Sequence, residues 1–182
     1  MRPFGKSIIR IIFSGAVFFV LDRFADVQTA IDVVRFTYAY PFLSCISIIF
    51  GPIVAGCSGI LGLLFSFLLK QTGFQWIDLV CIFLFCLFIG IFSMSGMDIK
   101  DGILGRNDLD VYLRTQIIAN VFVWFILRPL LYHYVLNAGL LNSLDEGLLL
   151  ALNRSLSGML IGSLLLDIFV RANYSEACFY RS

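Results

Sequence analysis

Charged residues are scarce in this chain of 182 residues. They make up 14% of the sequence, against roughly 25% in an average soluble protein, while 60% of the residues are hydrophobic and the mean hydropathy is +0.95. So few charges exclude a water-soluble globule, and a net charge of +1 at this hydrophobicity excludes a disordered chain. Because open strand edges cannot face lipid, we predict an all-α membrane protein.

Motifs for catalysis or metal binding are also lacking. The single histidine, His133, has no second histidine or carboxylate at helical spacing, and neither G-x-S-x-G nor a paired-histidine motif occurs. The five cysteines form no C-x-x-C pair, which indicates apolar packing residues. The sequence therefore predicts no enzyme activity, no cofactor, no metal site and no means of hydrolysing ATP.

Long apolar runs are what the sequence does contain. We predict one integral membrane domain, residues 1–182, as a bundle of six transmembrane helices at about 5–24, 36–50, 53–69, 76–95, 111–136 and 147–170. Gly51-Pro52 marks a tight turn between the second and third spans. Lysine and arginine concentrate at the span ends on one side of the membrane, so both termini are predicted to be cytoplasmic.

Small residues four apart occur in two of these spans. The pairs are Ala55 and Gly59, Ser58 and Gly62, and Gly158 and Gly162. This spacing lets a neighbouring helix approach closely, which in lipid replaces the missing hydrophobic driving force. We interpret the pairs as packing inside the bundle, and a face that binds another subunit is the alternative.

Polar residues form a stripe along the fifth span. Gln116, Asn120, Trp124 and Arg128 recur every four residues, and Arg154 lies in the sixth span. Arg128 lies roughly 12 Å and Arg154 roughly 10 Å below the expected outer ends of their helices, at 1.5 Å per residue. Polar groups are unfavourable in hydrocarbon, so this stripe is expected to face protein or a water-filled cavity.

The two arginines allow more than one interpretation. They can line a pocket open to the outside that binds a carboxylate or phosphate through forked hydrogen bonds. They can instead be neutralised by Asp78, Asp145 or Glu146, or contact lipid headgroups. From spacing and depth we select as candidate ligand-binding residues Arg35, Asn120, Trp124, Arg128 and Arg154.

Several segments of the first half resemble a known family. They are AVFFVLDRF at 16–24, PFL at 41–43 and IFGPIVAG at 49–56, and Arg35 matches an arginine that leads into the second helix there. The pattern is similar to the substrate-binding S components of energy-coupling-factor (ECF) vitamin transporters, with the folate-type branch closest. The resemblance implies a six-helix bundle that captures a vitamin from outside.

The resemblance also implies partners and a location. In that family the S component works with a transmembrane coupling subunit and two cytoplasmic ATPase subunits. Small residues of the first helix, here Ser14, Gly15 and Ala16, would contact the coupling subunit. The resemblance thus implies a multi-pass subunit of an importer in a prokaryotic plasma membrane that binds a small anionic vitamin, with folate as the candidate from the branch it resembles most, and the sequence predicts no nucleic-acid partner. A membrane scaffold of a cell-envelope assembly, without a transported ligand, is the alternative.

Overall fold

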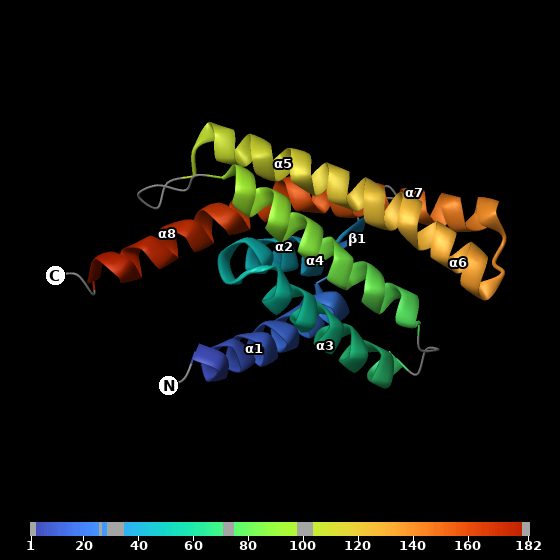
Figure 1. Cartoon of the computed structure of the whole chain (residues 1–182), viewed down its shortest axis with the longest axis horizontal. Helices are drawn as coiled ribbons and strands as arrows, with labels where there is room; N and C mark the ends of the chain where they lie inside the picture. Colours follow the sequence, from blue (N-terminus) through green and yellow to red (C-terminus); the bar gives the residue numbers. More distant parts are fainter. Residues whose placement is uncertain (1–2, 26, 29–34, 71–74, 98–103, 180–182) are drawn as a thin grey trace.

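A computed structural model describes residues 3–25, 27–28, 35–70, 75–97 and 104–179 as a bundle of tilted helices (Figure 1). Four helices come first: α1 (Pro3–Phe24), α2 (Ala39–Phe50), α3 (Pro52–Lys70) and α4 (Trp76–Gly96). The fifth runs without a break through α5 (Arg106–Asn120), the π-helix η1 (Val121–Leu127) and α6 (Arg128–Leu136). The sixth runs through α7 (Leu140–Ser157), the π-helix η2 (Gly158–Gly162) and α8 (Ser163–Phe179). The prediction of an all-helical six-helix membrane fold is confirmed.

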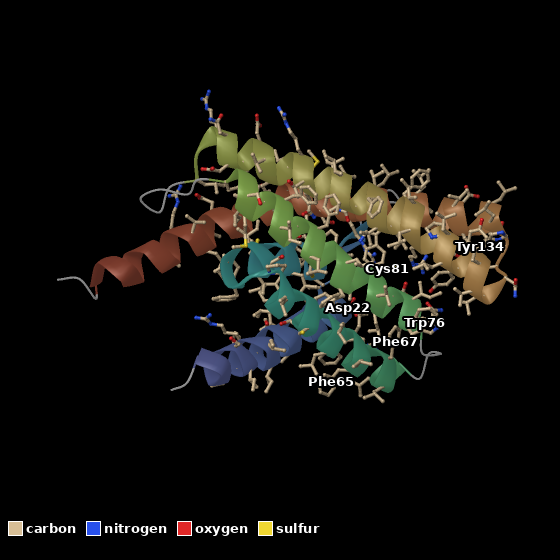
Figure 2. The ribbon with its side chains drawn as sticks, viewed as in Figure 1. Asp22, Phe65, Phe67, Trp76, Cys81 and Tyr134 are labelled. Carbon is tan, nitrogen blue, oxygen red and sulfur yellow. The ribbon has the colours of Figure 1, made fainter. Side chains whose placement is uncertain are left out.

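Helix lengths match a membrane. Among the described residues, four helices are long and apolar enough to cross one: Pro52–Leu69, Trp76–Gly96, Arg106–Leu136 and Leu140–Ala172. The apolar α2 is shorter, with 12 residues. Large apolar side chains project from the surface of the bundle, among them Phe65 on α3 at 48% exposure (Figure 2). Such a surface is suited to lipid rather than to water.

Helix boundaries differ from the predicted spans where polar groups cap or pair. The fifth helix begins at Arg106 and not at residue 111, because the Asp108 carboxylate accepts the Gly105 N–H at 3.0 Å. The second begins at Ala39, because Arg35–Phe36 (β2) pairs antiparallel with Val27–Gln28 (β1). The predicted turn between α2 and α3 is present, and Gly51 adopts a φ of 97° there, which favours glycine.

Small residues of α3 allow close contact with α1. The Ser14 and Ser58 hydroxyl oxygens are 2.6 Å apart in the buried contact. A Cβ on Gly15 would lie 2.9 Å from Leu61 Cδ2, and a Cβ on Gly62 would lie 2.8 Å from the Gly15 carbonyl oxygen. These glycines therefore pack α1 against α3 within the chain, as the packing interpretation of the third span expects.

The π-helical turns align the polar stripe. Residues four apart on an α-helix are displaced by about 40° around its axis. In a π-helix the wider i→i+5 turn displaces them in the opposite direction, and in η1 the Arg128 N–H donates to the Val123 carbonyl. A stripe that would otherwise spiral therefore stays on one side, so Gln116, Asn120, Trp124 and Arg128 are all buried.

Candidate ligand-binding site

Arg154 of α7 lies in the corner formed by two nearly perpendicular aromatic rings. Its guanidinium carbon is 3.7 Å from the ring centroid of Tyr40 in α2 and 3.5 Å from that of Trp124 in η1. One terminal nitrogen, Nη2, donates to the Tyr40 hydroxyl at 2.6 Å. Two cation–π contacts and this hydrogen bond fix the side chain in place. The guanidinium is thus positioned without an anion.

No carboxylate of the described residues forms an ion pair with Arg154. In the described part of the chain the ion pairs are Arg114–Asp110, Arg128–Asp78, Arg128–Glu146 and Arg171–Asp167. The second terminal nitrogen, Arg154 Nη1, is buried and has no hydrogen-bond partner. A cation desolvated in this way attracts an acceptor, preferably an anion.

The aromatic surroundings of Arg154 come from four helices. Tyr40 packs edge-on against Trp124, with ring centroids 5.5 Å apart, against Phe18 of α1 at 5.9 Å and against Phe85 of α4 at 6.3 Å. Phe18 and Phe85 are fully buried, and Trp124 is 1% exposed. These four rings, which we call the aromatic wall, pack together in the interior, and the Arg154 guanidinium lies against two of them.

Arg128 has a different environment, at the junction of α4 and α6. Its Nε donates to Asp78 Oδ1 at 2.8 Å, in the first turn of α4, and its Nη1 is 3.7 Å from Glu146 Oε2. Its guanidinium carbon lies 4.3 Å from the ring centroid of Tyr132, whose hydroxyl donates to the Gln75 side chain. Arg128 therefore has the acidic partners that the neutralisation interpretation expects, whereas Arg154 has none among the described residues.

The two arginines nevertheless belong to one electrostatic region. The carboxylates of Asp78 and Asp22 act on Arg154 in favour of its charged form, and the charge of Arg128 acts against it. Asp78 lies nearer to Arg128, with which it forms the 2.8 Å contact. The Asp78 carboxylate therefore forms its ion pair with Arg128 and acts on Arg154 only from a greater distance.

Buried polar atoms without partners gather between α2, the fifth helix and α7. Of the side-chain atoms in this condition among the described residues, five belong to a group that we call the polar seam: Thr37, Gln116, Asn120, Trp124 and Arg154. Contacts across the seam join it, since Thr37 N–H donates to Ser157 Oγ at 3.1 Å and Ser44 Oγ donates to Gln116 Oε1 at 3.0 Å. Each unsatisfied group costs on the order of 1–3 kcal/mol, so their accumulation at one place indicates a site completed by a bound molecule.

The remaining predicted residues are the three candidates for the partner interface and two candidates for ligand binding. Ser14 and Gly15 are buried against α3, so their surfaces are occupied within the chain, and of the three predicted partner-interface residues Ala16 is exposed. The backbone of Arg35 lies in β2, and its side chain lies outside the described structure. Asn120 is fully buried in the polar seam, where its amide nitrogen donates to the Gln116 carbonyl at 2.8 Å.

Tyr40 contacts the candidate site, although the sequence analysis did not select it as a site residue. A tyrosine near the end of a span is commonly part of the interfacial aromatic belt of a membrane protein, yet Tyr40 is 5% exposed and contacts Arg154 directly. Its spacing contained a usable signal, because Tyr40 and Ser44 lie one turn apart on α2 and both hydroxyls meet the polar residues of other helices. Tyr134, in contrast, is 77% exposed, as a belt residue would be.

The fold and this interior polar site define a membrane-embedded binding subunit, and comparison with known proteins identifies its family. The model of the family "ECF-type riboflavin transporter, S component" matches residues 6–171, so the chain belongs to that family. It is therefore a membrane component of a vitamin transporter that binds the substrate, and it is not an enzyme. The resemblance found in the sequence is confirmed.

Relatives extend over nearly the whole chain. A UPF0397 protein of Lactobacillus johnsonii is 28% identical over 182 residues, covering 97% of this chain and 95% of its own. A UPF0397 protein of Enterococcus faecalis is 26% identical over 164 residues, covering 90% of this chain and 89% of its own. The similarity thus covers most of the length of both proteins in each comparison.

A solved structure shares the fold. The crystal structure of FolT bound with folic acid superposes with a TM-score of 0.52 at 20% sequence identity, covering 87% of this chain and 92% of FolT. At this identity the likeness carries the fold alone. The family name mentions riboflavin and the solved relative binds folic acid, so the chemistry of the ligand is argued below from the side chains of this chain.

Proposed function

We propose that this chain captures a small anionic vitamin or related micronutrient from outside and presents it for ATP-driven uptake by partner subunits. The observation that carries the proposal is Arg154, whose guanidinium contacts the rings of Tyr40 and Trp124, forms no ion pair with a described carboxylate and has Nη1 unsatisfied. A carboxylate or phosphate on the ligand supplies the missing charge and the missing acceptor.

Donors outnumber acceptors in the polar seam, which limits the ligand further. The unsatisfied donors are Gln116 Nε2, Trp124 Nε1 and Arg154 Nη1, the unsatisfied acceptor is Asn120 Oδ1, and the Thr37 hydroxyl can act as either. A matching ligand therefore presents several acceptor atoms and at least one donor. Carboxylated or phosphorylated heterocycles with ring nitrogens and carbonyl oxygens have this pattern, and a flat ring suits the aromatic wall.

The roles of the predicted site residues follow from their environments. We assign Arg154, Trp124 and Asn120 to direct ligand binding, and we keep Arg35 in the site because of its motif. Arg128 fixes the α4–α6 wall of the site through Asp78. This assignment divides the two arginines into a binding residue and a positioning residue.

Energy for uptake must come from other subunits. The sequence contains no ATP-hydrolysing motif, so we propose a transmembrane coupling subunit and two cytoplasmic ATPase subunits as partners, in the plasma membrane of a prokaryote. The exposed face of α1 offers a surface for the coupling subunit, with Ala16 exposed beside Phe13 at 70% exposure. Small and apolar groups there let a second helix approach.

Native mass spectrometry of gently extracted protein tests the proposal. The wild-type protein is expected to retain one small anionic molecule, and Arg154→Gln is expected to reduce retention at least 100-fold, as loss of a buried charged hydrogen bond does. Arg171→Gln is the matched control, because Arg171 pairs with Asp167 on the surface and its side chain is 72% exposed. Undiminished retention by Arg154→Gln refutes the site, and copurification with envelope proteins without any ligand favours the scaffold alternative.

A further inference from the structure

An apolar groove runs along the lipid-facing side of the fifth and sixth helices. Its volume is about 390 Å³. Its two walls are formed by Ile117, Val121 and Phe125 and by Leu148, Leu152 and Leu156. Several of these side chains are open to the surroundings, including Leu152 at 51% and Val121 at 40% exposure. An apolar surface of this kind requires an apolar occupant.

The groove results from two close contacts with a space between them. At one end Gly147 packs on the fifth helix, where a Cβ would lie 2.6 Å from Pro129 Cγ and 2.7 Å from the Trp124 carbonyl oxygen. At the other end Gly158 packs against the Gln116 side chain. Between these contacts Ala151, which is 3% exposed, forms the floor, and its small side chain leaves the space unfilled.

The dimensions of the groove fit one acyl chain. From Ile117 to Phe125 the helix rises roughly 12 Å at 1.5 Å per residue, close to the roughly 15 Å depth of one leaflet of hydrocarbon. A methylene group takes up about as much space as a water molecule, roughly 30 Å³, so the groove accommodates about a dozen methylenes. A lipid tail has this length, this volume and this polarity.

The positively charged Arg114 side chain lies one helical turn beyond one end of the groove. Arg114 precedes Ile117 by one helical turn, and its side chain is 80% exposed with a loose contact of 3.9 Å to Asp110. Arg114 is also near the membrane surface, because Gly96 at the end of α4 lies opposite Val111, where a Cβ would be 2.9 Å from Val111 Cγ1. From this depth an arginine extends its guanidinium to the level of the lipid phosphates.

We infer that the groove binds one acyl chain of a phospholipid from the leaflet on the Arg114 side, with the lipid phosphate bound by Arg114. The length and apolar lining of the groove match an acyl chain, and the positive charge of Arg114 matches an anionic phosphate in the headgroup. In Figure 1 the helices that form the groove, α5 and α7, lie on the opposite side of the bundle from α1 and α3. A lipid bound here leaves the exposed face of α1 accessible to a coupling subunit.

The test uses the full-length protein in nanodiscs made from phosphatidylglycerol and phosphatidylethanolamine, followed by extraction and native mass spectrometry. The wild type is expected to retain one phospholipid, and Leu152→Trp or Val121→Trp, which fill the groove from opposite walls, are expected to lower the retained fraction at least 10-fold. Leu164→Trp is the matched control, because Leu164 is 67% exposed on α8 outside the groove.

Arg114→Gln separates the headgroup from the tail. It is expected to lower phospholipid retention about 10-fold and, in a second set of nanodiscs that also contain diacylglycerol, to leave retention of this uncharged lipid unchanged. The inference is overturned if the two groove-filling variants retain phospholipid like the wild type, or if they instead lose a copurifying membrane subunit or a second copy of the chain. Vitamin retention is measured in the same spectra, so failure of this inference is distinguishable from failure of the proposed function.

Discussion

Arg128 and Arg154 are the same residue type in neighbouring helices, and the structure treats them differently. Arg128 has an acidic partner at 2.8 Å, a second at 3.7 Å and one aromatic ring. Arg154 has two aromatic rings, a tyrosine hydroxyl and a nitrogen without a partner. Inside a membrane protein an ion pair neutralises a cation, whereas aromatic faces stabilise it and leave its charge in place. The first arrangement stabilises the fold, and the second is the one that we propose for binding a ligand.

The largest effect is expected from breaking the Arg128–Asp78 pair. Arg128→Met leaves the Asp78 carboxylate without its partner at 21% side-chain exposure, and we expect a loss of about 3 kcal/mol, the lower end for a broken buried pair. For a chain of this size such a loss lowers the thermal unfolding midpoint by roughly 6–12 °C. Tryptophan fluorescence during heating in detergent measures it.

A double variant supplies the control for this prediction. Arg128→Met combined with Asp78→Leu removes both charges and is expected to recover more than half of the lost stability, because no charge is left unpaired. Arg154→Met breaks no ion pair of the described residues, so it is expected to lower the midpoint less than Arg128→Met. The comparison fails if Arg154→Met proves as destabilising as Arg128→Met, or if the double variant recovers nothing.

A smaller effect is expected from the two tyrosine hydroxyls. Tyr40 accepts a hydrogen bond from Arg154 at 2.6 Å, whereas the Tyr132 hydroxyl is 3.3 Å from Arg128 Nη2. Tyr40→Phe keeps the ring but removes the acceptor of a charged donor that has no acidic partner among the described residues, and the expected loss is about 1.5–3 kcal/mol. Tyr132→Phe leaves Arg128 paired with Asp78, and the expected loss is about 0.5–1 kcal/mol.

The same heating experiment compares the two variants. Vitamin retention adds a second readout, since Tyr40→Phe changes the position of the proposed binding arginine and Tyr132→Phe does not. We expect weaker retention only in Tyr40→Phe. An equal loss of stability in both variants would show that the two arginines depend on their tyrosines to the same degree.

Local patterns in the sequence were sufficient for the architecture. Apolar runs and their polar breaks indicated six helices, and a four-residue spacing indicated a buried stripe on the fifth, because both depend on neighbours along one chain segment. The family resemblance rested on segments of the first half and was confirmed by a match over residues 6–171. Topology and family were therefore available before any contact was known.

The same local patterns could not predict which acidic residue pairs with which arginine. Asp78, Asp145 and Glu146 were equivalent candidates for neutralising the arginines, and only the packing of α4 against α6 brings Asp78, 50 residues away, to Arg128. The π-helical turns were also unforeseen, since they arise where the fifth and sixth helices pack closely and no residue type specifies them. The burial of Tyr40 likewise depends on rings from three other helices.

The smallest effect is expected at Glu146, the outer partner of Arg128. Its carboxylate is 3.7 Å from Nη1 and its side chain is 69% exposed, so water and salt screen the interaction. Glu146→Gln is expected to cost less than about 0.5 kcal/mol, and the difference from the wild type should vanish at high ionic strength. Heating curves at low and high salt measure it, with Asp78→Asn as the reference for the buried partner. If Glu146→Gln destabilises the protein as much as Asp78→Asn does, the exposed Glu146 neutralises Arg128 as well as the half-buried Asp78 does. The contrast between the two arginines then does not depend on a buried ion pair.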